Sequence, residues 1–220
     1  MKKTFEPYAD YQPRSFSFRD EQEVDHILGK YPKGYRQAAV MPLLDLAQRE
    51  VGEDAAKADP PYGGWIPRAA MEEIARILDI PSIRVEEVVT FYTMYHLAPV
   101  GRYVVQLCTT TPCWLCNSDA IVKACTDHLG IGMEETTPDW QFTLMEVECL
   151  GACVNAPMVQ INDNYYEDLT PTRMVEILDA LKAGEEQPTG SQTGRRGSMA
   201  EQGPTSLYER AKKAGIAARK

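Results

Sequence analysis

The sequence predicts a small helical bundle followed by a small α/β domain, because its hydrophobic periodicity changes near residue 98. Upstream of that point, apolar residues recur at every third or fourth position, as on one face of a helix. Downstream, short segments alternate between apolar and polar residues, as strands do, and helical segments lie between them. The chain has 220 residues, enough for one domain of ordinary size or two small ones.

The helical pattern runs from about residue 20 to residue 94. A helix is expected over 39–51 with Pro42 in its first turn, where proline is tolerated. Residues 54–64 are rich in Ala, Pro and Gly and predict a loop. Two further helices meet at Pro81-Ser82, with Ser82 expected as the N-cap of the second. Their apolar stripes, which are typical of buried core, are Met71, Ile74, Ala75 and Leu78, and then Val85, Val88, Val89 and Tyr92.

The α/β part opens with a strand that ends at Cys108 and has Tyr103, Val105 and Leu107 on one face. A helix from about Pro112 to Leu129 follows, closed by Gly130. A second strand contains Phe142, Leu144 and Glu146 and ends just before Cys149. The first strand, helix and second strand together have the pattern of a parallel crossover.

The remainder of this part predicts a hairpin and a final helix. Strands over 159–161 and 165–167 flank the turn Asn162-Asp163-Asn164. The helix begins with Thr170 as N-cap and Pro171 at its first position, and Gly184 ends it. Its buried stripe is expected to be Met174, Ile177, Leu178 and Leu181. The predicted order is therefore β-α-β-β-β-α.

Two terminal segments lack such patterns. Residues 1–18 are aromatic and contain proline, and predict an extended arm; the helical domain is then expected over 19–97 and the α/β domain over 98–184. Residues 185–220 are rich in Gly, Ser, Gln and Pro and predict a flexible tail. This tail carries seven basic and four acidic residues, against a net charge of −9 for the whole chain, so it could instead order on an acidic partner.

Composition excludes several classes of protein. A net charge of −9 argues against a nucleic-acid binder, whose contact surface would be basic. No apolar run approaches the roughly 18 residues of a membrane span, so direct membrane insertion is not expected. The sequence contains no G-x-G-x-x-G and no phosphate-binding loop motif, so this chain is not expected to bind NADH itself. The start of the chain has neither an apolar secretory segment nor an Arg-rich transit segment, which favours a reducing compartment.

Four of the six cysteines form two close pairs at predicted strand ends. The spacing is Cys108-x4-Cys113, then 35 residues, then Cys149-x3-Cys153. The ends of adjacent strands lie side by side in a β-α-β unit, so the two pairs are expected to converge. Four thiolates suit a [2Fe–2S] cluster, a [4Fe–4S] cluster or zinc, although zinc sites more often use C-x2-C pairs. The residues Gly151 and Ala152 are small, so backbone N–H groups could approach the sulfurs.

The residues around these cysteines resemble a known family. Cys108-Thr109-Thr110-Thr111-Pro112-Cys113 and Glu148-Cys149-Leu150-Gly151-Ala152-Cys153-Val154-Asn155-Ala156-Pro157 are similar to the thioredoxin-like [2Fe–2S] subunit of the NADH-dehydrogenase module of respiratory complex I, the NuoE-type family. The likeness also covers Ala38–Gln48, Trp65-Ile66-Pro67 and Val88–Tyr95. It extends from about residue 18 to residue 184.

The resemblance implies a helical N-terminal domain and a thioredoxin-like [2Fe–2S] ferredoxin domain. It implies that one [2Fe–2S] cluster is held by Cys108, Cys113, Cys149 and Cys153, and that no residue of this chain is catalytic. It further implies an electron-transfer subunit of NADH:quinone oxidoreductase, a hetero-oligomer that contacts the FMN- and NADH-binding subunit and a neighbouring iron–sulfur subunit. The expected location is peripheral, on the cytoplasmic side of a bacterial inner membrane, or on the matrix side in mitochondria.

Three alternatives stay open. The same subunit type serves soluble NAD-dependent hydrogenases and formate dehydrogenases. Cys113-Trp114-Leu115-Cys116 is a C-x2-C pair, which would also suit a thiol–disulfide oxidoreductase. A structural zinc module is the third. Cys116 is expected to be a spare thiol or an alternative ligand, and Cys125 a small core residue that shares a stripe with Leu115, Val122 and Leu129.

Overall fold

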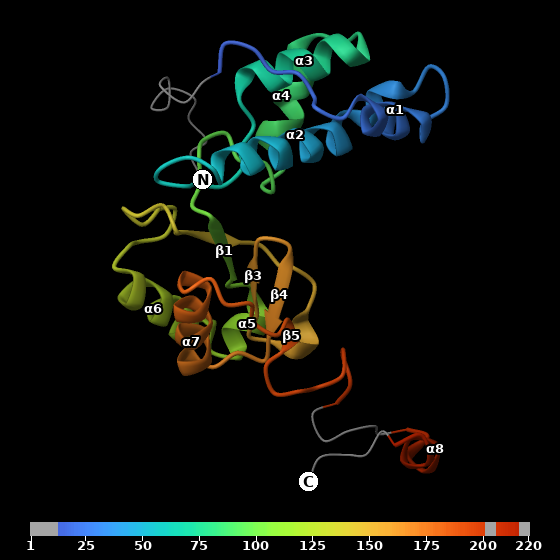
Figure 1. Ribbon diagram of the computed structural model, residues 1–220. Coiled ribbons are helices and arrows are strands. Elements are labelled where there is room, and N and C mark those ends of the chain that lie inside the picture. The colour runs from blue at the N-terminus through green and yellow to red at the C-terminus, as the bar shows by residue number, and fades with distance from the viewer. Residues whose placement is uncertain (1–12, 201–205, 216–220) are drawn as a thin grey trace. The chain divides into compact units, whose positions relative to one another are not determined.

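The structure is a computed structural model that describes residues 13–200 and 206–215 (Figure 1). The parts of the predicted arm and tail at residues 1–12, 201–205 and 216–220 lie outside the described residues. The described residues form two compact units: those up to residue 103 together with 138–142, and residues 104–137 together with those from 143 onward. The boundary differs from the expected one at 97/98, because the Gly63 N–H donates to the Val100 carbonyl and the Arg102 N–H to the Trp140 carbonyl, both inside the first unit.

The first unit is helical, as predicted. Its elements are α1 (Glu21–Gly29), the 3₁₀-helix η2 (Arg36–Ala39), α2 (Val40–Ala55), α3 (Arg68–Leu78) and α4 (Ser82–Phe91). Helix α2 packs against α3 and α4, and α3 packs against α4. Between α2 and α3, residues 56–67 form the predicted loop.

The core of this unit contains the predicted stripes. All four expected residues of α3 are buried, and Val85 and Val89 of α4 are fully buried. The other two residues of the stripe expected in α4 are not buried: Val88 is half-buried and Tyr92 is exposed. Tyr92 lies beyond the helix, which ends at Phe91. Other fully buried members are Leu43, Leu44, Ala47 and Ile66.

Two helix boundaries differ from the expected ones. Ser82 is the first residue of α4 and not its N-cap; Pro81 holds the cap position with an extended backbone, and no side-chain hydrogen bond caps this helix. The fixed φ of proline suits this position just before the helix. Helix α2 continues to Ala55, four residues beyond the expected Val51, and Pro42 lies in its first turn as predicted.

The second unit is an α/β domain with a mixed five-stranded sheet of order β2-β1-β3-β4-β5. Strands β1 and β3 pair antiparallel, as do β3 and β4, while β4 and β5 are parallel. Helices α6 and α7 pack against each other on the same side of the sheet (Figure 1). The elements are β1 (Tyr103–Cys108), α5 (Thr111–Leu115), α6 (Ser118–Leu129), β2 (Phe142–Val147), η3 (Cys153–Asn155), β3 (Val159–Ile161), β4 (Asn164–Glu167), α7 (Pro171–Lys182), β5 (Gly190–Ser191) and α8 (Tyr208–Lys213).

Several predicted details of this domain are confirmed. The Thr170 side chain accepts a hydrogen bond from the Arg173 N–H and so caps α7, with Pro171 at the first position. The four stripe residues of α7 are buried. Gly130 follows α6 with a φ of 68°, a left-handed conformation that favours glycine. The hairpin turn is shorter than expected, because Asn164 already belongs to β4 and pairs with Ile161.

The helix expected over 112–129 is two helices. Helix α5 ends at Leu115, and Asn117 then has a φ of 69° before α6 begins at Ser118. A left-handed residue cannot continue a helix, and asparagine tolerates this conformation better than most residues. The break turns Leu115 outward, with 71% of the residue exposed, so it is not part of the expected stripe around Cys125.

The segment after α7 also differs from the prediction. Residues 190–191 form strand β5 beside β4, and residues 191–197 make side-chain contacts with the domain. The predicted flexible tail from residue 185 is therefore ordered over this stretch, because it completes the edge of the sheet. In the described parts of the chain, no helix is long and apolar enough to cross a membrane.

Candidate metal centre

The four paired cysteines lie where elements of the second unit begin or end. Cys108 is the last residue of β1, and Cys113 lies in α5. Cys149 follows β2, and Cys153 is the first residue of η3. Cys108 and Cys113 are buried, Cys153 is half-buried and Cys149 is exposed. The site therefore has one pair inside the domain and one pair toward its surface.

The sulfurs of the two pairs approach one another. The Cys149 and Cys153 Sγ atoms are 3.3 Å apart. The Cys108 thiol interacts with the sulfur of Cys113, and the Cys149 sulfur interacts with those of Cys153 and Cys108. The structure thus brings together the four residues that the spacing singled out: one pair begins at the last residue of β1 and the other follows β2.

In each pair, one thiol has a lowered pKa. At Cys108 burial disfavours the thiolate, but hydrogen bonds from the Thr110 hydroxyl and N–H, the Cys113 thiol and the Leu150 N–H outweigh it and lower the pKa. The Cys108 Sγ lies 3.3 Å from the Thr110 Oγ1. At Cys149 the pKa is lowered first by the Gly151 N–H and then by the Cys153 thiol. Thiolate is the form that binds metal, so each pair contains one sulfur prepared for it.

The partner thiol of each pair has a raised pKa. Burial raises the pKa of Cys113 to about 12, against which only the Met158 N–H acts to stabilise the thiolate. The pKa of Cys153 is raised first by the neighbouring Cys149 sulfur and then by burial. Ligation at these two positions must therefore displace a proton, which couples metal uptake to pH.

An apolar group of residues surrounds the buried pair. Cys108 and Cys113 pack with Met158, and the partly buried residues against them are Leu150, Ala152, Ala156 and Tyr165. The Tyr165 hydroxyl donates to the Leu150 carbonyl at 2.8 Å and so fixes the loop between Cys149 and Cys153. Met158 directly precedes β3 and Tyr165 lies on β4, and neither belongs to a cysteine motif, so their contact with the cysteines could not be predicted from the sequence.

The other two cysteines lie apart from this arrangement. Cys116 is exposed at the C-terminal cap of α5, whereas Cys113 is buried in the same helix. Cys125 is fully buried in α6, and burial raises its pKa to about 12, as expected for a small core residue. Among the residues that the structure describes, no group of three or more Cys, His, Asp or Glu is arranged to hold a single metal ion. The four thiols come as two pairs that contact each other, and this arrangement suits a centre with two irons and two thiolates on each.

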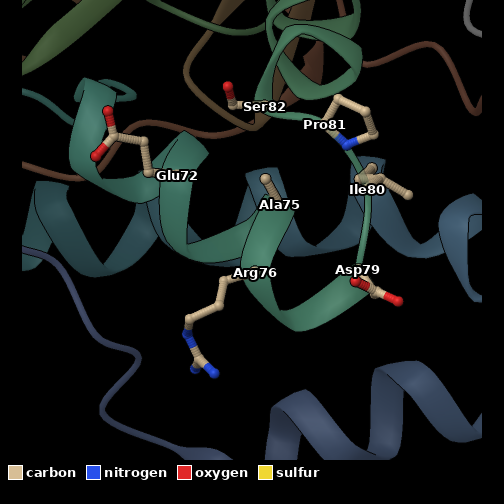
Figure 2. Close-up of a pocket in the computed structure, with 7 residues that line it drawn as sticks. All are labelled: Glu72, Ala75, Arg76, Asp79, Ile80, Pro81 and Ser82. Atoms are coloured by element: carbon tan, nitrogen blue, oxygen red, sulfur yellow. The ribbon is translucent and has the colours of Figure 1, made fainter.

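Two hollows on the helical unit are less suited to metal or redox chemistry than the cysteine site is. One hollow, of about 580 Å³, lies at the turn between α3 and α4. Figure 2 shows its lining residues, with Arg76 extending away from Pro81 and Ser82. Arg76 donates to both carboxylate oxygens of Glu73 at 2.7 Å, and this pairing lowers the pKa of Glu73. A second hollow of about 400 Å³ is lined by residues of the N-terminal segment and of α2. Neither is lined by a cysteine or a histidine.

Comparison with known proteins assigns the family. The family model of thioredoxin-like [2Fe–2S] ferredoxins matches residues 24–182, which include both cysteine pairs and most of the two units. The chain belongs to this family, whose members carry a [2Fe–2S] cluster. The donor set agrees with such a cluster: four thiols in two pairs, each pair with one sulfur of lowered pKa, beside an apolar group of residues.

The curated relatives of this chain include subunits of NADH dehydrogenases. The chain is 51% identical over 168 residues to a subunit of the NADH-quinone oxidoreductase of Rickettsia bellii, covering 76% of this chain and 94% of that protein. It is 48% identical over 200 residues to the mitochondrial NADH dehydrogenase [ubiquinone] flavoprotein 2 of Dictyostelium discoideum, covering 91% of this chain and 76% of that protein. A solved NAD⁺-reducing [NiFe]-hydrogenase in the air-oxidised state is 17% identical, with a TM-score of 0.50 over 63% of this chain and 24% of the hydrogenase chain. That likeness shows the fold.

Proposed function

We propose that Cys108, Cys113, Cys149 and Cys153 hold one [2Fe–2S] cluster through which this chain passes electrons within NADH:quinone oxidoreductase. The chain is a subunit of that complex, as its curated relatives at about half identity are, and it carries one cluster of this type. The observation that carries the ligand assignment is the convergence of two thiol pairs, one buried and one accessible, at the ends of β1 and β2.

When bound, a [2Fe–2S] cluster supplies one-electron redox chemistry. The work of this chain is to hold the ligands, to exclude water from the buried pair and to donate hydrogen bonds to the sulfurs. The Thr110 and Gly151 N–H groups already donate to Cys108 and Cys149, respectively. Such bonds stabilise negative charge on sulfur and raise the reduction potential. No side chain is required as an acid, a base or a nucleophile.

The partner follows from the same proposal. Hydride transfer from NADH gives two electrons at once, and a flavin divides them into single electrons. A chain without a nucleotide-binding motif needs a neighbour that holds both NADH and FMN, together with an iron–sulfur subunit that receives electrons. We place this assembly at the cytoplasmic side of a bacterial inner membrane, or at the matrix side in mitochondria.

Two other functions have less support. The fold of an NAD⁺-reducing hydrogenase is similar to this one, so the same module could serve a soluble enzyme, but the curated relatives favour the respiratory complex. A thiol–disulfide exchange function would need Cys113 and Cys116 to act together. Cys113 is 1% exposed and its pKa is raised to about 12, which disfavours the thiolate that such exchange requires.

The test is metal and sulfide analysis of the anaerobically purified chain and two matched variants. The unaltered chain should contain about two iron and two acid-labile sulfide per chain and give a rhombic EPR signal on reduction. Cys153→Ser should lose or strongly alter that signal, whereas Cys116→Ser should retain the iron, the sulfide and the spectrum. Stoichiometric zinc without sulfide, or loss of the cluster in Cys116→Ser alone, would refute the ligand assignment. Co-purification with an FMN-containing subunit tests the partner separately.

A further inference from the structure

The segment after α7 lies against the turn that follows Cys153. Strand β5 pairs with β4 in parallel, with Gly190 opposite Tyr166 and Ser191 opposite Glu167. The Gln192 N–H then donates to the Glu167 carbonyl at 2.9 Å. Figure 1 shows this stretch beside β4 at the edge of the sheet. Residues 190–197, here called the C-terminal strap, therefore reach the part of the domain that carries a cysteine pair.

Arg195 connects the strap to the cysteine turn. Its Nη2 lies 2.9 Å from the Asp168 Oδ1, and its Nη1 donates to the Val154 carbonyl at 3.1 Å. Val154 is the residue directly after Cys153. Only 14% of the Arg195 side chain and 6% of the Asp168 side chain are exposed. The guanidinium is thus an oriented group in a largely buried pair and not a surface charge.

The carboxylate of Asp168 is itself held in place. The Ser191 hydroxyl donates to its Oδ2 at 2.5 Å and accepts the Arg195 N–H at 3.0 Å. Asp168 has a φ of 52°, a conformation that side-chain-bearing residues adopt at some cost. Its N–H donates to the Asn155 carbonyl at 2.7 Å, so the same residue is tied to both the strap and the turn.

Asn155 gives a second connection, independent of the arginine. Its Nδ2 donates to the Glu167 Oε2 at 2.6 Å and to the Gly197 carbonyl at 2.8 Å. Asn155 is 4% exposed and ends the 3₁₀-helix that begins at Cys153. The turn from Cys153 to Asn155 is therefore bound at two successive residues by the strap, and at its end by the segment after β4.

We propose that Arg195 is a positioning residue of the cluster site, which fixes the backbone of Cys153 by bridging Asp168 and the Val154 carbonyl. This role rests on the proposed function, in which Cys153 is a ligand. Arg195 does not touch the sulfur; it acts through the turn. Groups that orient a metal ligand in this way change metal retention by about 10- to 100-fold when they are removed.

The charge of Arg195 has a second consequence. The guanidinium contacts the carbonyl next to a ligand, at a site that exposes little of it to water. The guanidinium neutralises the buried Asp168 carboxylate, and without it that negative charge would disfavour the reduced cluster, which is more negative than the oxidised one. Arg195 is therefore expected to raise the reduction potential of the cluster as well as to slow its loss.

The test compares three variants of the full chain with the cluster in place: Arg195→Gln, Arg195→Lys and Arg196→Gln. Arg196 is the exposed neighbour of Arg195 and serves as the matched control. Cluster release into excess chelator is followed anaerobically by the loss of visible absorbance, and the midpoint potential is measured by redox titration. Arg195→Gln should release the cluster at least about 10-fold faster than Arg196→Gln and should have a lower potential. Arg195→Lys keeps the charge but cannot bridge both acceptors, so its release should be faster with a nearly unchanged potential.

Equal release rates and equal potentials in Arg195→Gln and Arg196→Gln would overturn the proposal. If Arg195→Gln does not fold, Arg195→Lys provides the test. Cluster release from Arg195→Lys at the same rate as from the unaltered chain would contradict the bridging role. A role in fold stability alone would change the unfolding midpoint and leave the potential and the EPR spectrum unaltered. Failure of the proposed function looks different, because the unaltered chain would then take up no iron and sulfide.

Discussion

The Tyr165 hydroxyl donates a hydrogen bond to the Leu150 carbonyl oxygen at 2.8 Å, which joins strand β4 to the loop between Cys149 and Cys153. The N–H of the same Leu150 donates to the Cys108 sulfur and helps to lower the pKa of that thiol. Leu150 is thus held from both sides, by a phenol through its carbonyl and by a sulfur through its N–H. The Tyr165 hydroxyl therefore acts on Cys108 indirectly, because it sets the position of the Leu150 N–H that donates to the Cys108 sulfur.

Replacement of Tyr165 by Phe tests this relationship. The variant keeps the ring that packs near Cys108 and Cys113 but leaves the Leu150 carbonyl without this donor. The free energy of unfolding of the chain should fall by about 1 kcal/mol in chemical denaturation, the usual worth of such a bond. Amide hydrogen exchange in the loop from Cys149 to Cys153 should also become faster. Tyr35→Phe, at a residue 66% exposed, is the control; equal stability and equal exchange in the two variants would contradict the role of the hydroxyl.

Thr170→Ala tests the start of α7. The Thr170 Oγ1 accepts the Arg173 N–H at 3.2 Å and so satisfies a donor that the first turn otherwise leaves free. Its loss should lower the free energy of unfolding by about 1 kcal/mol, measured by chemical denaturation. Thr172→Ala, at an exposed position in the same turn, should change it by at most about 0.5 kcal/mol. Equal losses in the two variants would show that the cap contributes nothing of its own.

Tyr95 gives a prediction for alkaline pH. Burial raises the pKa of Tyr95 to about 12, helped by the charges of Asp45 and Tyr92, and its hydroxyl donates to the Met41 carbonyl at 2.9 Å. The unfolded chain loses this proton near its ordinary pKa of about 10, before the folded chain does. The stabilising contribution of protonated Tyr95 is therefore complete below pH 10 and is lost as the pH rises toward 12.

Chemical denaturation at a series of pH values between 9 and 12 measures that loss. Tyr95→Phe has no proton to lose at this position, so its free energy of unfolding should fall less steeply than that of the unaltered chain over the same range. Other groups that titrate there are common to both proteins and cancel in the comparison. Parallel curves for the two proteins would show that Tyr95 does not titrate differently in the folded and unfolded chain.

The sequence was informative where local patterns decide the structure. Strand β1 ends at Cys108 as its alternation predicts, and the cap at Thr170 follows from a threonine before a proline. Both features depend on neighbours in the sequence. The cysteine spacing also led to four thiols that the structure brings together, because the ends of adjacent strands lie close in any such sheet. That these thiols ligate a cluster stays a prediction.

The features that the sequence did not predict depend on single-residue conformations or on long-range contacts. Apolar residues on both sides of Asn117 fit one continuous stripe, so periodicity could not detect that a left-handed residue separates α5 from α6. Strand β5 and Arg195 lie in a segment whose composition is typical of disorder. Strand β5 pairs with β4, and Arg195 contacts Asp168, which follows β4, and the carbonyl of Val154, which follows Cys153. Long-range contacts of this kind leave no periodic signal in either partner. The three threonines that follow Cys108 are evident in the sequence, but only the structure shows that Thr110 is the one whose hydroxyl lies beside the Cys108 sulfur.

Glu50 provides a final prediction, for the helical unit. Its carboxylate accepts the Arg19 N–H through both oxygens, at 3.2 and 3.1 Å, and the Arg19 guanidinium donates to the Glu50 carbonyl. The Glu50 side chain is 9% exposed, whereas that of Glu53, which pairs with the same arginine at 3.3 Å, is 69% exposed. Glu50→Ala should therefore lower the free energy of unfolding by about 1.5–3 kcal/mol, because the Arg19 N–H loses a charged acceptor. Glu53→Ala removes only a solvent-exposed pair and should cost at most about 1 kcal/mol. Chemical denaturation of both variants separates the two cases; equal losses would mean that the bond to the Arg19 backbone adds nothing to the ion pair.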